Sequence, residues 1–136
     1  MKRNATAVWQ GTVKEGSGKL TTQSKVLDNA QYSFKTRFED GIGTNPEELV
    51  AAAHAGCFTM QLSAFITEAG HEIESIETKC DITMENFTIT GSHLTINAKV
   101  NDISDSDFQE LVRKAEKNCP ISKLFNAEIT SDATLA

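Results

Sequence analysis

The stretch that organises the chain is NPEELVAAAHAGCFTMQLSAFI, residues 45–66. It opens as helices open, because Asn45 is a favoured N-cap residue and Pro46 fits the first helical position. Glu47 and Glu48 follow, where the positive end of the helix dipole favours carboxylates, and Glu48 is placed to complete a capping box. The pattern therefore predicts a helix that begins at Pro46.

The same helix carries no Asp, Glu, Lys or Arg between Leu49 and Thr67. A helix that is apolar all round is either a membrane span or the central element of a core. A membrane span needs about 20 predominantly apolar residues. Here polar residues such as His54 and Gln61 interrupt the run, and acidic rather than basic residues precede it. We expect a buried central helix that ends at Gly70, a suitable C′ residue.

Composition limits the class of protein. The chain has 136 residues, which suits one domain over residues 1–136, and its 39% hydrophobic and 24% charged residues are those of a soluble globule. The net charge of −6 argues against nucleic acid and anionic membranes as partners. No signal-peptide pattern follows Met1, so we expect a cytoplasmic protein whose three cysteines are not structural disulfides.

Alternating and helical patterns flank the central helix. Hairpin-like connections dominate over strand–helix–strand units, so we expect an α+β fold with antiparallel sheets around the long buried helix. One sheet covers only one side of that helix, and we therefore expect a second copy of the chain on the other side, as a homodimer. The expected strands are residues 5–13, 20–26, 32–38, 76–85, 94–100 and 128–130, and the further helices begin near Ser104 and near Leu124.

Cys57 lies in the middle of the central helix. A thiol in apolar surroundings is ordinarily inert, because burial raises its pKa, and the helix dipole fades within about one turn. A reactive Cys57 therefore needs a cation from elsewhere. Arg37 ends a predicted strand and has a guanidinium that stabilises nearby thiolates, and Glu47 can hold it by a bidentate pair. From spacing alone, a solvated arginine and a plain helix-start carboxylate are the favoured interpretations.

The other thiols occupy different settings. Cys119 precedes a proline at the opening of a short helix, where backbone N–H groups lower a thiol pKa. Cys80 lies on the apolar face of a strand and is expected to be a small core residue. With no C-x-x-C pattern, the three cysteines do not indicate a zinc site. His54 lies one turn before Cys57; a packed histidine is favoured over a catalytic pair, because a catalytic base needs a third group to orient it.

These motifs resemble the OsmC/Ohr family, and more specifically its OsmC branch. The resemblance rests on GTNPEEL and AAHAGCFTM within residues 43–60, TRFE at residues 36–39 and NCPISK at residues 118–123. It extends over essentially the whole chain, from AVWQG at residues 7–11 to AEIT at residues 127–130. The family implies cytoplasmic, intertwined α+β homodimers that reduce organic hydroperoxides, and hydrogen peroxide less readily, through two cysteines.

The resemblance also assigns roles to residues. It makes Cys57 the peroxidatic cysteine, Cys119 the resolving cysteine, Arg37 the activating arginine and Glu47 its carboxylate partner. The implied reaction leads from a Cys57 sulfenic acid to a disulfide with Cys119, which an external dithiol, such as a lipoyl-bearing protein, must reduce. No metal, haem or flavin cofactor is required.

Two residues stand outside these roles. Cys80 has no counterpart in the motif, and His54 matches a common family residue to which no catalytic role carries over.

Helix geometry adds an expectation about the subunits. Glu47 and Cys57 are about 15 Å apart along a straight helix. We therefore expect Arg37 and Glu47 to serve Cys57 of the partner subunit. Two alternatives remain open: a non-catalytic small-molecule binding protein that uses the dimer cleft, and a cysteine–histidine acyl hydrolase built on His54 and Cys57.

Overall fold

The computed structural model describes residues 1–136 and divides the chain into two compact units, Met1–Leu49 and Val50–Ala136. The central helix α2, Pro46–Glu68, begins in the first unit and continues into the second. The secondary structure is a mixture of two three-stranded sheets and four helices, so the α+β class is confirmed. The single domain expected over residues 1–136 stays a prediction.

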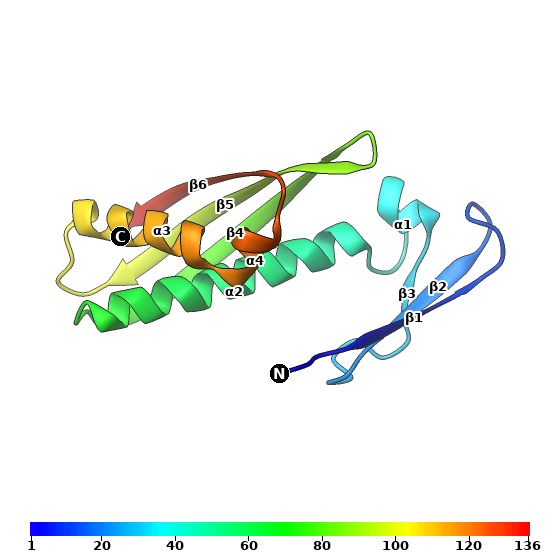
Figure 1. Ribbon diagram of the computed structural model, residues 1–136, viewed down its shortest axis with the longest axis horizontal. Coiled ribbons are helices and arrows are strands. Elements are labelled where there is room, and N and C mark those ends of the chain that lie inside the picture. Colours follow the sequence, from blue (N-terminus) through cyan, green and yellow to red (C-terminus); the bar gives the residue numbers. More distant parts are fainter. The chain divides into compact units, whose positions relative to one another are not determined.

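The first unit contains an antiparallel sheet of β1 (Ala5–Gln10), β2 (Ser17–Thr22) and β3 (Ala30–Tyr32), drawn in blue to cyan in Figure 1. The rings of Trp9 and Tyr32 lie 5.6 Å apart on this sheet. Gly18 lies beneath both rings, where a Cβ atom would clash with the Tyr32 ring. The absence of a side chain at Gly18 therefore lets the two aromatic rings pack on the strand.

The strand expected over residues 32–38 is wrong beyond its first residue. β3 ends at Tyr32, and Phe34–Phe38 form the short helix α1. The Ser33 hydroxyl accepts from the Thr36 N–H at 3.3 Å, and the Thr36 hydroxyl oxygen accepts from the Ser33 N–H at 2.8 Å. This reciprocal cap starts a helix and prevails over the period-two alternation. The rings of Phe34 and Phe38 then meet at 4.9 Å on one helix face.

Helix α2 begins and ends as its sequence predicts. The Asn45 side chain accepts from the Glu48 N–H at 2.8 Å. The Glu48 carboxylate accepts from the Thr44 hydroxyl at 2.6 Å, so its bond is to a side chain and not to the Asn45 backbone as the capping box required. At the other end Gly70 has φ +88, and the following N–H, of His71, donates to the Ile66 carbonyl oxygen. Such a left-handed residue is a common helix stop.

The second unit contains a sheet in the order β4–β5–β6. β4 (Ile73–Glu85) and β5 (Thr88–Val100) form a long antiparallel hairpin, turned by Asn86 and Phe87, which both have positive φ. β6 (Glu128–Leu135) pairs with β5 in parallel, so the expectation of antiparallel pairing is wrong for this strand. Parallel pairing follows because a helical crossover connects β5 to β6.

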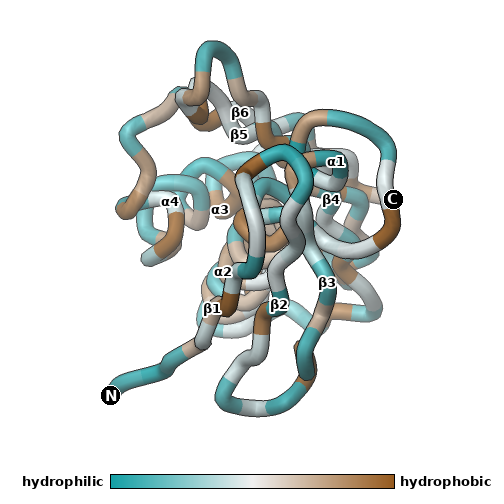
Figure 2. Tube along the Cα trace, turned by 90° about the vertical axis from the view of Figure 1, so that its right-hand side faces the viewer, coloured by the Kyte–Doolittle hydropathy of each residue, from teal (hydrophilic) through white to brown (hydrophobic).

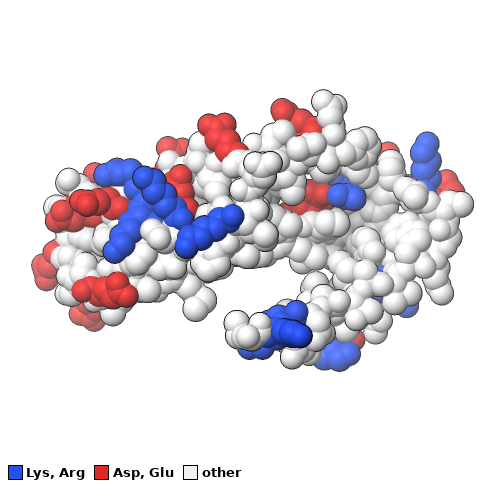
Figure 3. Space-filling view, viewed as in Figure 1, with Lys and Arg blue, Asp and Glu red and all other residues white.

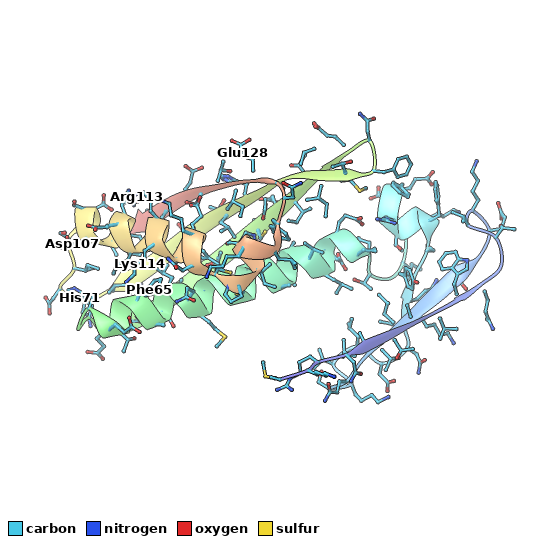
Figure 4. All side chains as sticks on the ribbon, viewed as in Figure 1. Phe65, His71, Asp107, Arg113, Lys114 and Glu128 are labelled. Atoms are coloured by element: carbon cyan, nitrogen blue, oxygen red, sulfur yellow. The ribbon has the colours of Figure 1, made fainter.

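Two helices cover one face of this sheet. Helix α3, Asp105–Asn118, begins at an N-cap hydroxyl of Ser104 and runs beside α2 (Figure 1). The Nζ atom of Lys114 lies 4.0 Å from the ring centroid of Phe65, which connects the two helices (Figure 4). The residues that meet between the helices and the sheet are Phe58, Leu62, Ile66, Leu94, Ile96, Ala98, Val100, Phe108, Val112, Ala115 and Cys119.

Burial of α2 is confirmed on one face only. Its fully buried residues, His54, Phe58, Leu62 and Ile66, recur every four positions. On another face Met60 is 76% exposed. Figure 2, which looks nearly along α2, shows much of this helix as white to brown, in contrast to the teal of most connecting loops. By length and composition α2 is apolar enough to cross a membrane, although its buried stripe packs within the protein core.

Charge on α3 is distributed along the helix dipole. Asp105 and Asp107 lie in its first turn, and Lys117 lies in its last turn. Together with Arg113 and Lys114, Lys117 forms the group of basic side chains that gathers over the later half of α3 in Figure 3. Acidic first turns and basic last turns stabilise a helix.

Candidate active site

Two cysteines that lie far apart in the sequence meet in the second unit. The Cys57 Sγ is 2.8 Å from the Cys119 Sγ, and both are free thiols. A disulfide bond is about 2.05 Å long, so only a small movement separates these sulfurs from bonding distance. Cys119 is fully buried, whereas Cys57 is half-buried. The pair is therefore suited to reversible oxidation to a disulfide.

Cys119 is held at the junction between two helices. It is the C-cap of α3 and the N-cap of the short helix α4, Pro120–Leu124. Pro120 disfavours helical backbone at the residue before it, and Cys119 accordingly has φ −60 and ψ 126. The proline thus ends α3 and starts α4 at the thiol, as the Asn-Cys-Pro sequence predicts.

Burial raises the pKa of the Cys57 thiol, and Cys119 raises it further, mainly through the hydrogen bond between the two sulfurs and to a smaller extent through like-charge repulsion. A backbone hydrogen bond from Ile121 acts in the opposite direction and lowers the pKa. No cation is among the groups that shift this pKa. The surroundings of Cys57 within its own unit therefore favour the neutral thiol.

The third cysteine packs where its strand pattern predicts. Cys80 on β4 is half-buried against the core, and burial raises the pKa of its thiol. Its sulfur lies 3.2 Å from the hydroxyl oxygen of Ser92 on β5. No group of three or more His, Cys, Asp or Glu side chains is arranged to hold a metal ion.

Arg37 and Glu47 form an ion pair in the first unit. The Nε of Arg37 donates to the Oε1 of Glu47 at 2.9 Å. The bidentate pair that the sequence suggested is not formed, because the bond uses a single nitrogen and the second oxygen, Oε2, has no hydrogen-bond partner. Arg37 is the penultimate residue of α1 and does not end a strand.

An aromatic hollow of about 270 Å³ lies beside this ion pair, within the first unit. Its walls combine apolar rings with one guanidinium, so it offers an apolar surface next to a positive charge. It is lined by Trp9, Val13, Tyr32, Ser33, Phe34, Arg37, Phe38 and Pro46.

His54 is fully buried one turn before Cys57 and contacts two serines. Its Nδ1 lies 2.6 Å from the Ser92 Oγ, and its Nε2 lies 2.8 Å from the Ser122 Oγ. Burial lowers the pKa of the imidazole, which favours its neutral form. Both ring nitrogens are thus occupied by serine hydroxyls, which disfavours the cysteine–histidine pair with Cys57.

Neither serine was identified from the sequence. Ser122 is part of the NCPISK segment, but that pattern alone does not reveal which side chain it meets. Ser92 lies on the core-facing side of β5, in line with Leu94, Ile96 and Ala98. A small polar residue at a core-facing position of this strand is the only feature of the sequence that points to it.

Comparison with known proteins places these features in a family context. A family model described as OsmC-like protein matches residues 39–134. Peroxiredoxin OsmC of Escherichia coli is 44% identical over 133 residues, which cover 95% of this chain and 93% of that protein. Organic hydroperoxide resistance protein OhrB of Bacillus subtilis is 36% identical over 112 residues, which cover 79% of this chain and 80% of that protein.

Solved structures show the same fold. The crystal structure of OhrB of Bacillus subtilis has a TM-score of 0.65 at 25% identity and covers 98% of both chains. An OsmC-like protein from Mycoplasma pneumoniae has a TM-score of 0.78 at 14% identity, covering 100% of this chain and 98% of that one. The expected fold is therefore confirmed over the full length of the chain.

Proposed function

The chain belongs to the OsmC family, in its OsmC branch, and from that premise we propose that it is a thiol-dependent peroxidase that reduces organic hydroperoxides. The observation that carries the proposal is the 2.8 Å separation of the Cys57 and Cys119 sulfurs. Relatives named peroxiredoxin and organic hydroperoxide resistance protein support the same activity. Hydrogen peroxide is the poorer substrate in this proposal.

The proposed cycle has three balanced steps. The Cys57 thiolate attacks one peroxide oxygen, the O–O bond breaks, and the alkoxide leaves as an alcohol after protonation, so that Cys57 becomes a sulfenic acid. The Cys119 thiol then condenses with this group, which forms the disulfide and releases water. An external dithiol reduces the disulfide by exchange and is itself oxidised to a disulfide. None of these steps needs a metal or an organic cofactor.

Arg37 is the proposed activator of Cys57. The groups around Cys57 raise its pKa overall, so a nearby cation is needed to produce thiolate at neutral pH. Glu47 holds Arg37 through Nε alone, which leaves the two Nη groups of the guanidinium to bind a thiolate. Because Glu47 and Cys57 are about 15 Å apart along α2, we assign Arg37 and Glu47 to Cys57 of the partner subunit.

A homodimer is part of this proposal. The exposed face of α2 supports it, since Met60 is 76% exposed and no neighbouring atom lies within 4 Å of a Cβ placed on Gly56. An apolar helix that is buried on one face within its own chain has a second face left for another chain.

The aromatic hollow of the first unit is the proposed site for the organic part of the substrate. Its apolar walls suit an alkyl or aryl group, and Arg37 lies in the same lining. Phe38 lines the hollow, whereas Phe58, which follows Cys57 on α2, is fully buried in the core of the second unit. Hydrogen peroxide has no apolar part and gains nothing from these walls.

The reductant and the location complete the proposal. Disulfide exchange requires an external dithiol, and a lipoyl-bearing protein is the proposed source. We place the protein in the cytoplasm, where thiols are kept reduced, and its net charge of −6 gives no reason to expect nucleic acid as a partner.

Treatment with one equivalent of cumene hydroperoxide, followed by intact-mass measurement and peptide mapping, tests the proposed function. A peroxidase loses two hydrogens and gains a link between Cys57 and Cys119. The variant Cys119→Ser should instead gain oxygen at Cys57. A wild-type chain that stays fully reduced would contradict the proposal and would favour a non-catalytic binding protein.

A further inference from the structure

A buried imidazole connects the two helices that carry the reactive thiols. His54 lies three residues before Cys57 on α2, and Ser122 lies three residues after Cys119 on α4. The His54 Nε2 and the Ser122 Oγ are 2.8 Å apart, and the exposed fractions of the two residues are 0% and 6%. A hydrogen bond shielded from water in this way has no solvent to replace it, so its loss leaves a buried polar group unpaired.

Helix α4 is held by the packing of Ile121 against the core and by hydrogen bonds to α2. It has only five residues, too few to be stable by itself, and its N-cap Cys119 makes no side-chain capping hydrogen bond. Leu124, at its end, is 74% exposed. Two successive residues of α4 instead bond to α2: the Ile121 backbone to Cys57, and the Ser122 hydroxyl to His54.

The imidazole is itself held from the sheet. Its Nδ1 lies 2.6 Å from the Ser92 hydroxyl oxygen on β5, and the Phe125 ring meets it edge-on at 4.9 Å between centroids. A neutral imidazole donates one hydrogen bond and accepts one, and a serine hydroxyl can take either role. The imidazole therefore contacts both β5 and α4, and its Nε2 hydrogen bond to Ser122 is the one that reaches α4.

We propose that His54 is a positioning residue for the resolving step, which acts through Ser122 to keep Cys119 within reach of Cys57. The inference rests on the proposed peroxidase function. After the first attack, Cys57 carries a sulfenic acid that has two fates. Condensation with the Cys119 thiol forms the disulfide and releases water, whereas a second hydroperoxide oxidises the sulfenic acid to sulfinic acid and leaves as an alcohol. The position of Cys119 decides between them.

Two substitutions of His54 separate the two hydrogen bonds. A glutamine amide nitrogen can take the place of Nε2, and an asparagine amide can take the place of Nδ1. His54→Gln therefore keeps the bond to Ser122, whereas His54→Asn keeps the bond to Ser92 and loses Ser122. Both variants lose the ring and its contact with Phe125, and the asparagine side chain is one methylene shorter than that of glutamine.

The measurement is rapid-quench oxidation with cumene hydroperoxide, in which peroxide loss, disulfide and sulfinic acid are followed separately. In His54→Asn and in Ser122→Ala, first-turnover peroxide loss should stay within about twofold of wild type, while disulfide formation slows about tenfold and sulfinic acid rises accordingly. His54→Gln should stay close to wild type in the ratio of disulfide to sulfinic acid. Ser92→Ala leaves the hydrogen bond between His54 and Ser122 intact, so it should also keep the wild-type ratio of disulfide to sulfinic acid.

The inference would be overturned if His54→Asn and His54→Gln gave equal ratios of disulfide to sulfinic acid, or if Ser122→Ala gave the wild-type ratio. Thermal unfolding identifies any variant that fails to fold, and the comparison then uses Ser122→Ala against Ser122→Thr, which restores the hydroxyl. A wild-type protein that forms neither disulfide nor sulfenic acid would instead contradict the proposed function, so the two failures are distinguishable.

Discussion

Arg37 donates from Nε to the Oε1 of Glu47 at 2.9 Å, while the other carboxylate oxygen of Glu47 is buried without a hydrogen-bond partner. The pair is asymmetric in exposure too, since the Arg37 side chain is 43% exposed and that of Glu47 is 15% exposed. Glu47 thus orients the guanidinium through Nε and leaves its two Nη nitrogens accessible. An arginine held in this way suits the binding of a second anion better than the stabilisation of the fold.

Arg37→Ala should raise the pKa of Cys57. An opposite charge close to a thiolate lowers its pKa by about one unit or more, so its loss should slow alkylation of Cys57 at pH 7 about tenfold. The measurement is the pH dependence of iodoacetamide alkylation at Cys57. Arg113→Ala, which removes an arginine from α3, is the matched control and should leave the rate unchanged. An unaltered Cys57 pKa in Arg37→Ala would exclude the proposed role.

Mixing two inactive variants should restore activity if the site is shared between subunits. Cys57→Ser chains retain Arg37 and Glu47, and Glu47→Ala chains retain Cys57. In a two-fold symmetric dimer, random mixing of equal amounts gives one complete site in half of the dimers, or about a quarter of the wild-type activity. Turnover of cumene hydroperoxide before and after denaturation and refolding of the mixture measures this recovery. Absence of recovery would place both residues in the same subunit as their cysteine.

Phe38→Ala should weaken the use of organic hydroperoxides selectively. Removing one aromatic wall of the hollow costs roughly 1–2 kcal/mol of apolar contact, so the KM for cumene hydroperoxide should rise about tenfold. The KM for hydrogen peroxide should not change. Val26→Ala, a truncation of an 86% exposed residue, is the control. A parallel rise for both peroxides would show that the hollow does not bind the organic group.

The buried His54 should make the protein less stable in mild acid. Burial lowers its pKa in the folded state below the ordinary value of 6.5, so between these two pKa values the unfolded chain binds more protons than the folded chain. The free energy of unfolding should therefore fall as the pH drops below about 6.5, by up to about 1.4 kcal/mol per pH unit. Urea unfolding at pH 7.5 and pH 5.5 measures the effect.

His54→Gln provides the reference for this measurement, since it retains the Ser122 bond and has no imidazole. The difference between wild type and His54→Gln isolates the effect of His54 from that of the other two histidines, His71 and His93, and of the carboxylates. An identical pH dependence in the two proteins would show that His54 does not control this loss of stability.

The sequence predicts best where the signal is local. The start of α2 follows from Asn45, whose side chain makes the expected cap, and its end follows from Gly70 with its positive φ. The meeting of Cys57 with Cys119 was predicted through resemblance to a family, because spacing alone cannot bring residues so far apart into contact.

The failures have equally physical reasons. Alternating residues from Tyr32 onwards suggested a strand. The capping box between Ser33 and Thr36 instead starts helix α1, and this local hydrogen bonding prevails over the period-two pattern. Parallel pairing of β6 depends on the crossover through α3 and α4, which no short pattern encodes. The serines that bind His54 lie 38 and 68 positions away and have no helical or strand spacing to it.

The complete burial of Cys119 at the junction of α3 and α4 sets the order in which the oxidised protein can be regenerated. An incoming dithiol can approach only the sulfur of Cys57, which is half-buried. The transient mixed disulfide therefore forms on Cys57, and Cys119 departs as the leaving thiolate. The dithiol therefore reacts at the same sulfur as the peroxide, so oxidant and reductant must use the Cys57 site in succession.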